Sequence, residues 1–315
     1  MMRAWAKWML VAAVAMPYAT GCAPVRARTD VAAPPSPPLA TAAELAASYN
    51  ANAAAIRTLL LDVDVGSANL PRAGLFWKLV ADMAWLGGRI RGTGGKSYLT
   101  VSGYLLLQKP SELRMFGTLP LVGGRAFDLA SDGNRFELSL PTVGEFIQGR
   151  NDCAPTTARS PLRRLRPSEI LEALPAFPIP SADRLAMIPG KEREYRLRVE
   201  TGTAAGDMHT VREMIFSRSE PRLQRQIFYD GRGERSLIAN YRDYMVTDGV
   251  AFPRTITLEH PGAYSLLLSL TQAPAINRAN PAFNDAKTFA LEPAPGAKIL
   301  DQSQCLPAAA PDPVP

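Results

Sequence analysis

The feature that most constrains the fold is an alternation of apolar and polar residues that recurs along most of the chain. Tyr195, Leu197 and Val199 alternate with charged residues, and 59–65 has the same period of two. This period is typical of half-buried strands in antiparallel sheets with one solvated face. Turn dipeptides such as Asp-Gly and Pro-Gly separate many of these segments. We therefore expect a large, strongly curved antiparallel sheet.

Helices are expected at two places beside these strands. Thr41 and Glu44 form a capping box ahead of a helix at 42–57. The mostly apolar stripe of this helix is Leu45, Tyr49, Asn52 and Ile56. A short helix is expected at 168–174, between two prolines. Strands are expected at 58–65, 97–108, 112–119, 124–131, 135–140, 193–199, 211–218, 223–229, 235–246, 255–259 and 264–271. The fold class is α+β and mainly β.

The beginning of the chain has the features of an export signal. Arg3 and Lys7 precede a short apolar run at 9–15, and small residues lead to Gly21 and Cys22. This order is typical of a secretory signal peptide. The apolar run is too short to span about 30 Å of hydrocarbon. Because the segment ends at Gly-Cys, it resembles the bacterial lipobox, which implies that 1–21 is removed and that Cys22 carries lipid. The alternative is an ordinary signal peptide with Cys22 unmodified.

Proline and alanine dominate the segments on both sides of the expected domain. Residues 22–40 form a Pro/Ala-rich linker after the lipidated cysteine, and 306–315 is expected to be a disordered tail. The folded domain therefore spans 41–305. Ala23, rather than Asp, follows Cys22. By the sorting rule of this lipoprotein class, the protein is expected at the outer membrane, lipid-anchored and facing the periplasm.

The charge of the chain does not favour a nucleic-acid partner. The formal net charge is +6, and removal of Arg3 and Lys7 leaves 33 basic and 29 acidic residues, a net +4. No stripe of basic residues interleaved with aromatic residues accompanies this mild excess, and a basic isoelectric point alone is a poor argument for nucleic-acid binding. Export also argues against such a partner.

Cysteine usage predicts one disulfide. The chain has three cysteines. If Cys22 is acylated, Cys153 and Cys305 remain as a pair in an oxidising compartment, where disulfides persist. Two isolated thiols are the alternative.

The order of elements resembles the LolA/LolB-like lipoprotein-carrier superfamily over most of 42–300. The recurring motifs are Lys109-Pro110 at the end of a strand pair, an Asp-Gly turn at 132–133, Gly249-Val250 with Pro253, and Phe-x-Leu-x-Pro-x-Pro-Gly at 289–296. The resemblance implies an incomplete β-barrel in which a few helices cover an apolar cavity for acyl chains. It also implies a role in moving or receiving lipoproteins. The functional arginine of the carrier and the protruding leucine of the receptor align with no position here.

The sequence offers no constellation for catalysis. His209 and His260 lie in different predicted elements, and neither has metal-ligand spacing to cysteine or to another histidine. The segment 92–97 ends in Gly-Lys-Ser but lacks the preceding glycine of a phosphate loop. Asp62 and Asp64 share a face of one strand and are expected to be its solvated side. We therefore expect no enzyme activity, no metal and no cofactor.

One segment is unusually apolar for its place in the chain. As a helix, 75–86 would have apolar residues around nearly its whole circumference. The residues expected to contact a hydrophobic ligand or the membrane are Phe76, Trp77, Leu79, Val80, Met83, Trp85 and Leu86. The alternative is a buried core helix packed on the sheet.

These observations favour a binding protein with no catalytic role. We expect a lipid-anchored periplasmic protein with an apolar pocket for acyl chains or lipoproteins, acting in lipoprotein or lipid transport to the outer membrane. Its partners would be the membrane, through the anchor, an acyl chain or lipidated protein, and an envelope protein. The alternative is a structural or assembly lipoprotein with no ligand cavity. An internal cavity, or lipid that co-purifies with the protein, separates the two.

Overall fold

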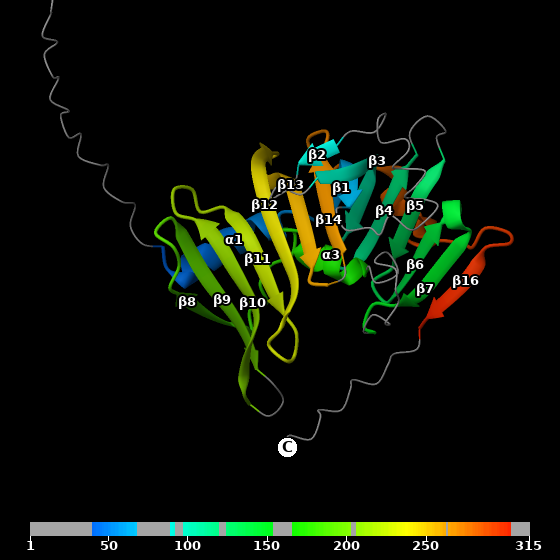
Figure 1. Cartoon of the computed structure of the whole chain (residues 1–315). Coiled ribbons are helices and arrows are strands. Elements are labelled where there is room, and N and C mark those ends of the chain that lie inside the picture. The colour runs from blue at the N-terminus through cyan, green and yellow to red at the C-terminus, as the bar shows by residue number, and fades with distance from the viewer. Residues whose placement is uncertain are drawn as a thin grey trace, which may run out of the picture. The chain divides into compact units, whose positions relative to one another are not determined.

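The computed structural model describes residues 40–67, 89–91, 97–119, 124–153, 166–202, 206–262 and 264–303. All of them belong to one compact unit, Leu39–Pro315, which is mainly β (Figure 1). Its strands are β1 (Thr58–Ser67), β2 (Arg89–Arg91), β3 (Ser97–Gln108), β4 (Glu112–Thr118), β5 (Arg125–Ser131), β6 (Arg135–Leu140), β7 (Glu145–Arg150), β8 (Arg184–Ile188), β9 (Glu194–Gly202), β10 (Met208–Ser217), β11 (Leu223–Tyr229), β12 (Arg235–Thr247), β13 (Val250–His260), β14 (Tyr264–Leu270), β15 (Ala275–Ile276) and β16 (Lys298–Gln302). Its helices are α1 (Ala42–Ala54) and α3 (Pro167–Ala173), with 3₁₀ turns η2 (Pro141–Val143), η4 (Pro281–Asn284) and η5 (Ala286–Phe289).

All sixteen strands belong to one sheet. Its order is β16-β7-β6-β5-β4-β3-β1-β14-β13-β12-β11-β10-β9-β8, with β15 beside β1 and β2 beside β3. Every pair is antiparallel except β16 with β7, which is parallel. Because β16 and β8 lie at opposite ends of this order, the sheet is open and does not close into a barrel (Figure 1). The mainly β, antiparallel fold class is confirmed.

The period-two segments place their apolar residues on the inner face of the sheet. In β9, Tyr195, Leu197 and Val199 are buried in the main core, while the arginines between them lie on the other face. The inner residues of β1, from Leu59 to Val65, belong to the same core. Register therefore follows the side-chain alternation, because a slip of one residue would turn every apolar side chain outward.

The capping box begins α1 as the sequence predicts. The Thr41 hydroxyl accepts a hydrogen bond from the Glu44 amide at 3.2 Å, and the Glu44 carboxylate accepts one from the Thr41 amide at 2.8 Å. The expected helix 42–57 ends earlier, at Ala54. Asn277 explains this end, since its side chain bonds the Ala55 carbonyl at 2.7 Å and the amides of Arg57 and Thr58 at 2.8 and 3.1 Å.

Both helices lie on the inner face. Tyr49 of α1 meets Phe216 of β10 edge to face, with 6.4 Å between ring centroids. The second helix, α3, contacts β5 and β12, which belong to different halves of the sheet. Pro167 is its first residue, as suits a helix N-terminus. The two helices therefore fill the space that the curvature of the sheet encloses.

The outer face of the β3–β7 half is covered by the chain between β15 and β16. Arg114 of β4 donates a hydrogen bond to the Thr288 carbonyl at 2.9 Å and pairs with Asp128 of β5 at 2.8 Å. Phe289 is buried in this layer. The covering segment then leads to β16 at the edge, as Figure 1 shows in orange and red.

Candidate functional site

Helix side chains occupy most of the concave face, where a hydrophobic ligand would lie. Leu45 and Tyr49 of α1, and Ile170 of α3, are packed in the main core with Ile56 and Leu174. Protein interiors leave few voids between such side chains. Open space lies instead beside the helices, in two hollows described below.

The larger of these hollows opens between α3 and the strands β10 and β11. It has a volume of about 550 Å³ and is called here the mouth groove. Its apolar walls are Leu171, Phe177, Val211 and Phe228, and Ser111, Gly133 and Asn151 line it from the other half of the sheet. The volume lies within the range of about 300–1,000 Å³ that is usual for small-molecule sites. The mouth groove is therefore large enough to hold part of a ligand.

One face of α3 lines the mouth groove. Ser168, Leu171 and Glu172 all contribute to its wall. They are spaced i, i+3 and i+4, and residues at this spacing share one side of a helix. Ile170 and Ala173 turn the other way and are fully buried. The short helix thus divides the core from the groove.

Arg212 and Glu172 bring opposite charges into the mouth groove. Glu172 is open to solvent, yet the groove walls take enough of its hydration to raise the pKa of its carboxyl group, and the nearby charge of Arg212 opposes this shift. Arg212 also lies over Phe228, 5.7 Å from the ring centroid. An apolar recess lined by one cation, Arg212, and two acids, Glu172 and Asp183, can bind an acyl chain and the polar group at its end.

A buried chain of hydrogen bonds leads inward from Arg212. The guanidinium donates to the Gln226 side-chain oxygen at 3.2 Å, and the Gln226 amide donates to the Tyr241 hydroxyl at 2.6 Å. That hydroxyl donates to the Ala173 carbonyl at the end of α3, also at 2.6 Å. Burial raises the pKa of Tyr241 well above its usual value. The network holds α3 against β10–β12 while the hydroxyl stays neutral.

A smaller hollow of about 290 Å³ lies at the other end of this network. Tyr49, Pro175 and Phe216 line it, between α1 and the β10–β12 strands. Burial raises the pKa of Tyr49, whose hydroxyl is enclosed near Gln226. The mouth groove is thus lined by α3, and the smaller hollow by α1.

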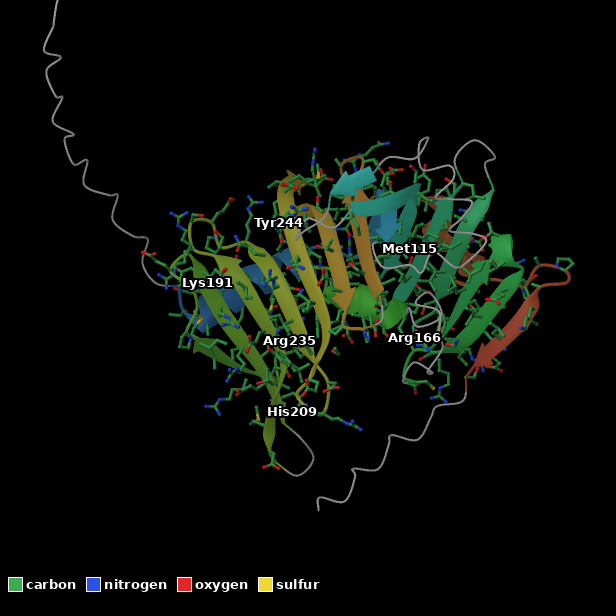
Figure 2. All side chains as sticks on the ribbon, in the orientation of Figure 1. Met115, Arg166, Lys191, His209, Arg235 and Tyr244 are labelled. Carbon is green, nitrogen blue, oxygen red and sulfur yellow. The ribbon has the colours of Figure 1, made fainter. Side chains whose placement is uncertain are left out.

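The first turn of α3 is attached to the β13–β14 hairpin. The Tyr264 hydroxyl donates a hydrogen bond to the Glu169 carboxylate, and His260 Nε2 lies 3.7 Å from that carboxylate. Burial raises the pKa of Glu169, an effect that Tyr264, His260 and Arg166 oppose. Arg166, labelled in Figure 2, donates to Gln302 of β16 at 2.9 Å. The helix is thus attached to both halves of the sheet.

Most of the residues singled out from the sequence lie outside the described residues. These are Cys22, Cys305 and the seven residues Phe76, Trp77, Leu79, Val80, Met83, Trp85 and Leu86. Cys153 is buried and disulfide-bonded, and its sulfur lies 3.7 Å from the Ser303 carbonyl. The pairing of Cys153 with Cys305 stays a prediction.

The part of the chain that the structure describes has no helix long and apolar enough to cross a membrane. It also contains no group of three or more His, Cys, Asp or Glu side chains placed to hold a metal ion.

Sequence reasoning missed the polar residues of the inner face. Arg212 is in phase with Met214 and Phe216, which are buried, and Gln226 is in phase with Phe228. A charged or amide side chain at a core position of a strand is the signal that would have found them. The sequence could not predict which helix they contact, because α3 ends 39 residues before Arg212 and 53 before Gln226.

Comparisons with known proteins identify related folds. No family model matches the sequence, and no curated protein matches it. A LolA superfamily protein from Nitrosomonas europaea is 11% identical, with 78% of this chain and 97% of that chain covered and a TM-score of 0.43. A DUF1329 family protein from Desulfovibrio piger is also 11% identical, with 79% of this chain and 97% of that chain covered and a TM-score of 0.48.

A Vibrio parahaemolyticus protein described as an outer membrane lipoprotein-sorting protein domain is 10% identical, with 79% of this chain and 97% of that chain covered and a TM-score of 0.44. These are likenesses of fold over most of the chain. At 10–11% identity and TM-scores below 0.5, each of the three proteins is similar to this chain in fold alone.

Proposed function

We propose that this protein is a lipid-anchored periplasmic binding protein of the outer membrane, and that its mouth groove holds an acyl chain of a lipid or lipoprotein. The observation that carries the proposal is the groove itself, about 550 Å³ with Leu171, Phe177, Val211 and Phe228 in its walls. An acyl chain gains about 0.8 kcal/mol for each CH₂ that it buries. Binding of this kind needs no catalytic group.

Arg212 gives the mouth groove a polar end. Its guanidinium carries donors beyond the one that bonds Gln226. An ester or amide carbonyl at the head of an acyl chain would accept a hydrogen bond from it, while the chain lies against Phe228. Glu172 on the facing side of the groove would repel a free carboxylate, so an ester or amide fits better than a free fatty acid.

The test is to fill the groove from α3. Ser168→Trp places a large side chain on the half-buried groove face of this helix. Protein purified from membranes is extracted with organic solvent, and the lipid per protein is measured by mass spectrometry. Wild type is expected to carry acyl lipid, and Ser168→Trp to lose most of it. Ser219→Trp, at an exposed position outside the groove, is the matched control and is expected to keep the lipid.

Lipid that is absent from wild type, or that persists in Ser168→Trp at the control level, would contradict the proposal. The first outcome would favour a structural or assembly lipoprotein without a ligand.

The lipid anchor is proposed at Cys22, after the apolar run and Gly21. Labelled palmitate is expected to enter wild type and not Cys22→Ser. Entry into both, or into neither, would refute the anchor.

Residues 75–86 are proposed as a second hydrophobic contact. The Trp77→Ser, Trp85→Ser double variant is expected to fold and to bind lipid less well than wild type.

A further inference from the structure

The outer face of β9–β12 has a feature that acyl-chain binding does not use. Ile215 and Ile227 are buried there, although they lie on the side of the sheet opposite to the main core. Pairing register places Arg196 beside Ile215, Ile215 beside Arg225, and Ile227 beside Ile238. Neighbouring strands are about 4.8 Å apart. Ile215 is therefore flanked by arginines from both adjacent strands, while Ile227 lies between Glu213 and Ile238.

Two hollows in this face are lined by cations. One has a volume of about 270 Å³ and the other about 630 Å³, and Gln224 and Arg225 belong to both. The cations that line them are Lys191, Arg196, Arg222, Arg225, Arg235 and Arg242, which we call the basic face. The acids in the same lining are Glu194, Glu220 and Asp243. Six cations against three acids leave a net charge of +3 on the lining.

Three of these cations are engaged within the protein. Arg196 pairs with Glu213 at 2.7 Å, Arg222 pairs with Glu220, and Arg225 donates to Asn240 at 2.6 Å. The other three, Lys191, Arg235 and Arg242, are exposed and form no ion pair with any described residue. Figure 2 labels Lys191 and Arg235 on this half of the sheet.

We infer that the basic face docks on the anionic headgroups of a phospholipid bilayer. Lysine and arginine can lay aliphatic stems on apolar surface while their charged ends reach outward. Lys191 and Arg235 line the hollow that contains Ile215, Ile227 and Ile238, and Arg242 lines the neighbouring hollow. The charge of these three exposed cations is complementary to a surface of phosphates.

The proposed lipid anchor supports this occupant, because it would hold the domain beside a bilayer. The Ala40 amide, where the expected linker enters the domain, donates to the Tyr195 hydroxyl of β9 at 3.4 Å. Arg196, the next residue of that strand, lies on the basic face. Ala40 therefore contacts the inner side of β9, the strand whose outer side carries Arg196. This step rests on the proposed lipid anchor.

The experiment uses the chain from residue 23 onward, which carries no lipid and keeps the whole unit Leu39–Pro315. Co-sedimentation is measured with vesicles of phosphatidylcholine alone and with added phosphatidylglycerol. The test variant is Lys191→Gln, Arg235→Gln, Arg242→Gln. The control removes three exposed cations from the other half, by Arg135→Gln, Lys287→Gln, Lys298→Gln.

Wild type is expected to bind the anionic vesicles and not the neutral ones, with binding that weakens as salt rises. Each cation near an anionic surface is worth roughly a fivefold change in partition, so the test variant is expected to bind on the order of one hundredfold less. The control is expected to bind nearly like wild type. Equal binding of wild type to both vesicles, or equal losses in test and control variants, would overturn the inference.

Lipid extracted from the mouth groove is a separate readout on the same variants. The test variant is expected to keep groove lipid at the wild-type level, because its substitutions line other hollows. Loss of vesicle binding with groove lipid intact supports the basic face. Vesicle binding by wild type that lacks groove lipid would refute the groove proposal and support the basic face.

Discussion

At the scale of single residues, Gln226 is the central member of the buried hydrogen-bond network, a role that the sequence pattern does not predict. It is fully buried on β11, where it accepts from Arg212 and donates to Tyr241. Gln226→Ala leaves buried partners without their hydrogen bonds, which costs about 1–3 kcal/mol. We expect the free energy of unfolding, measured in urea, to fall by this amount.

Gln224→Ala is the matched control for that substitution. Gln224 lies two residues earlier on the same strand and is exposed, so its loss is expected to change stability by no more than about 0.5 kcal/mol. Equal effects at the two positions would show that strand propensity, and not the buried network, determines the loss.

Glu169 gives the protein a predictable dependence on pH. Burial raises the pKa of its carboxyl group above the ordinary 4.5 in the folded state. The folded protein therefore holds the proton more tightly than the unfolded chain, and stability falls as pH rises from 4.5 through the folded pKa. Glu169→Gln removes this loss while keeping an acceptor for Tyr264.

The measurement is urea unfolding of wild type and Glu169→Gln across the acid range. The stability difference, variant minus wild type, is expected to grow as pH rises above 4.5. Glu192→Gln, at an exposed site, controls for the loss of one negative charge. A difference that stays constant with pH would contradict the assignment.

At the scale of elements, sequence patterns located most strands and both helices. Alternation and turn dipeptides place β3 to β6, β9 to β12 and β14 close to their observed bounds, while β13 begins five residues before the predicted 255–259. The edge strands β8 and β16 were not predicted, because neither shows clear alternation of buried and exposed residues. A strand with one neighbour and little burial has no need for alternating apolar residues, so its sequence does not show the period of two.

Asn52 has a role in α1 that the helical stripe does not predict. It occupies an inward position of α1, where an apolar residue was expected. Its side chain donates to the Ala251 carbonyl at 3.0 Å and accepts from the Ala251 amide at 2.8 Å, which attaches α1 to β13. Asn52→Ala leaves both backbone groups unpaired, at a cost of about 1–3 kcal/mol each when buried.

Thermal unfolding is the measurement for Asn52→Ala. A clear fall in Tm is expected, and the smaller hollow, which Asn52 and Ala251 both line, is expected to open further to solvent probes. Ser48→Ala, on an exposed position of α1, is the control and is expected to be neutral. If both variants unfold alike, the attachment to β13 contributes nothing measurable.

At the scale of the whole molecule, the pairing of β1 with β14 is central. It connects the half of the sheet that contains β3 to β7 with the half that contains β8 to β14. Period-two patterning predicted the mainly β class, but it has no information on which distant strands pair. The return of the chain after β15, across the outer face of β4 and β5, depends on contacts such as Arg114 with Thr288, 174 residues apart. The mouth groove could not be predicted from the sequence either, since its walls come from six or more separate segments.

The pairing of β16 with β7 supports the predicted Cys153–Cys305 disulfide. The two strands run parallel, with Gln302 beside Gly149, so both chains leave the pair in the same direction. Cys153 follows β7 by three residues, and Ser303 follows β16 directly, with its carbonyl 3.7 Å from the Cys153 sulfur. A bridge to Cys305 would therefore fix an edge strand that has a single neighbour.

The bridge would close a loop of about 150 residues, worth about 4–5 kcal/mol in the chain-entropy model. Thiol labelling of unfolded, non-reduced protein is expected to find neither Cys153 nor Cys305 free, and both after reduction. Cys153→Ser with Cys305→Ser is expected to lower the free energy of unfolding by a few kcal/mol and to raise hydrogen exchange first in β16, where the edge is released. Two labelled thiols in non-reduced protein would refute the bridge, and unchanged exchange in β16 would show that Arg166 and Gln302 hold that edge without it.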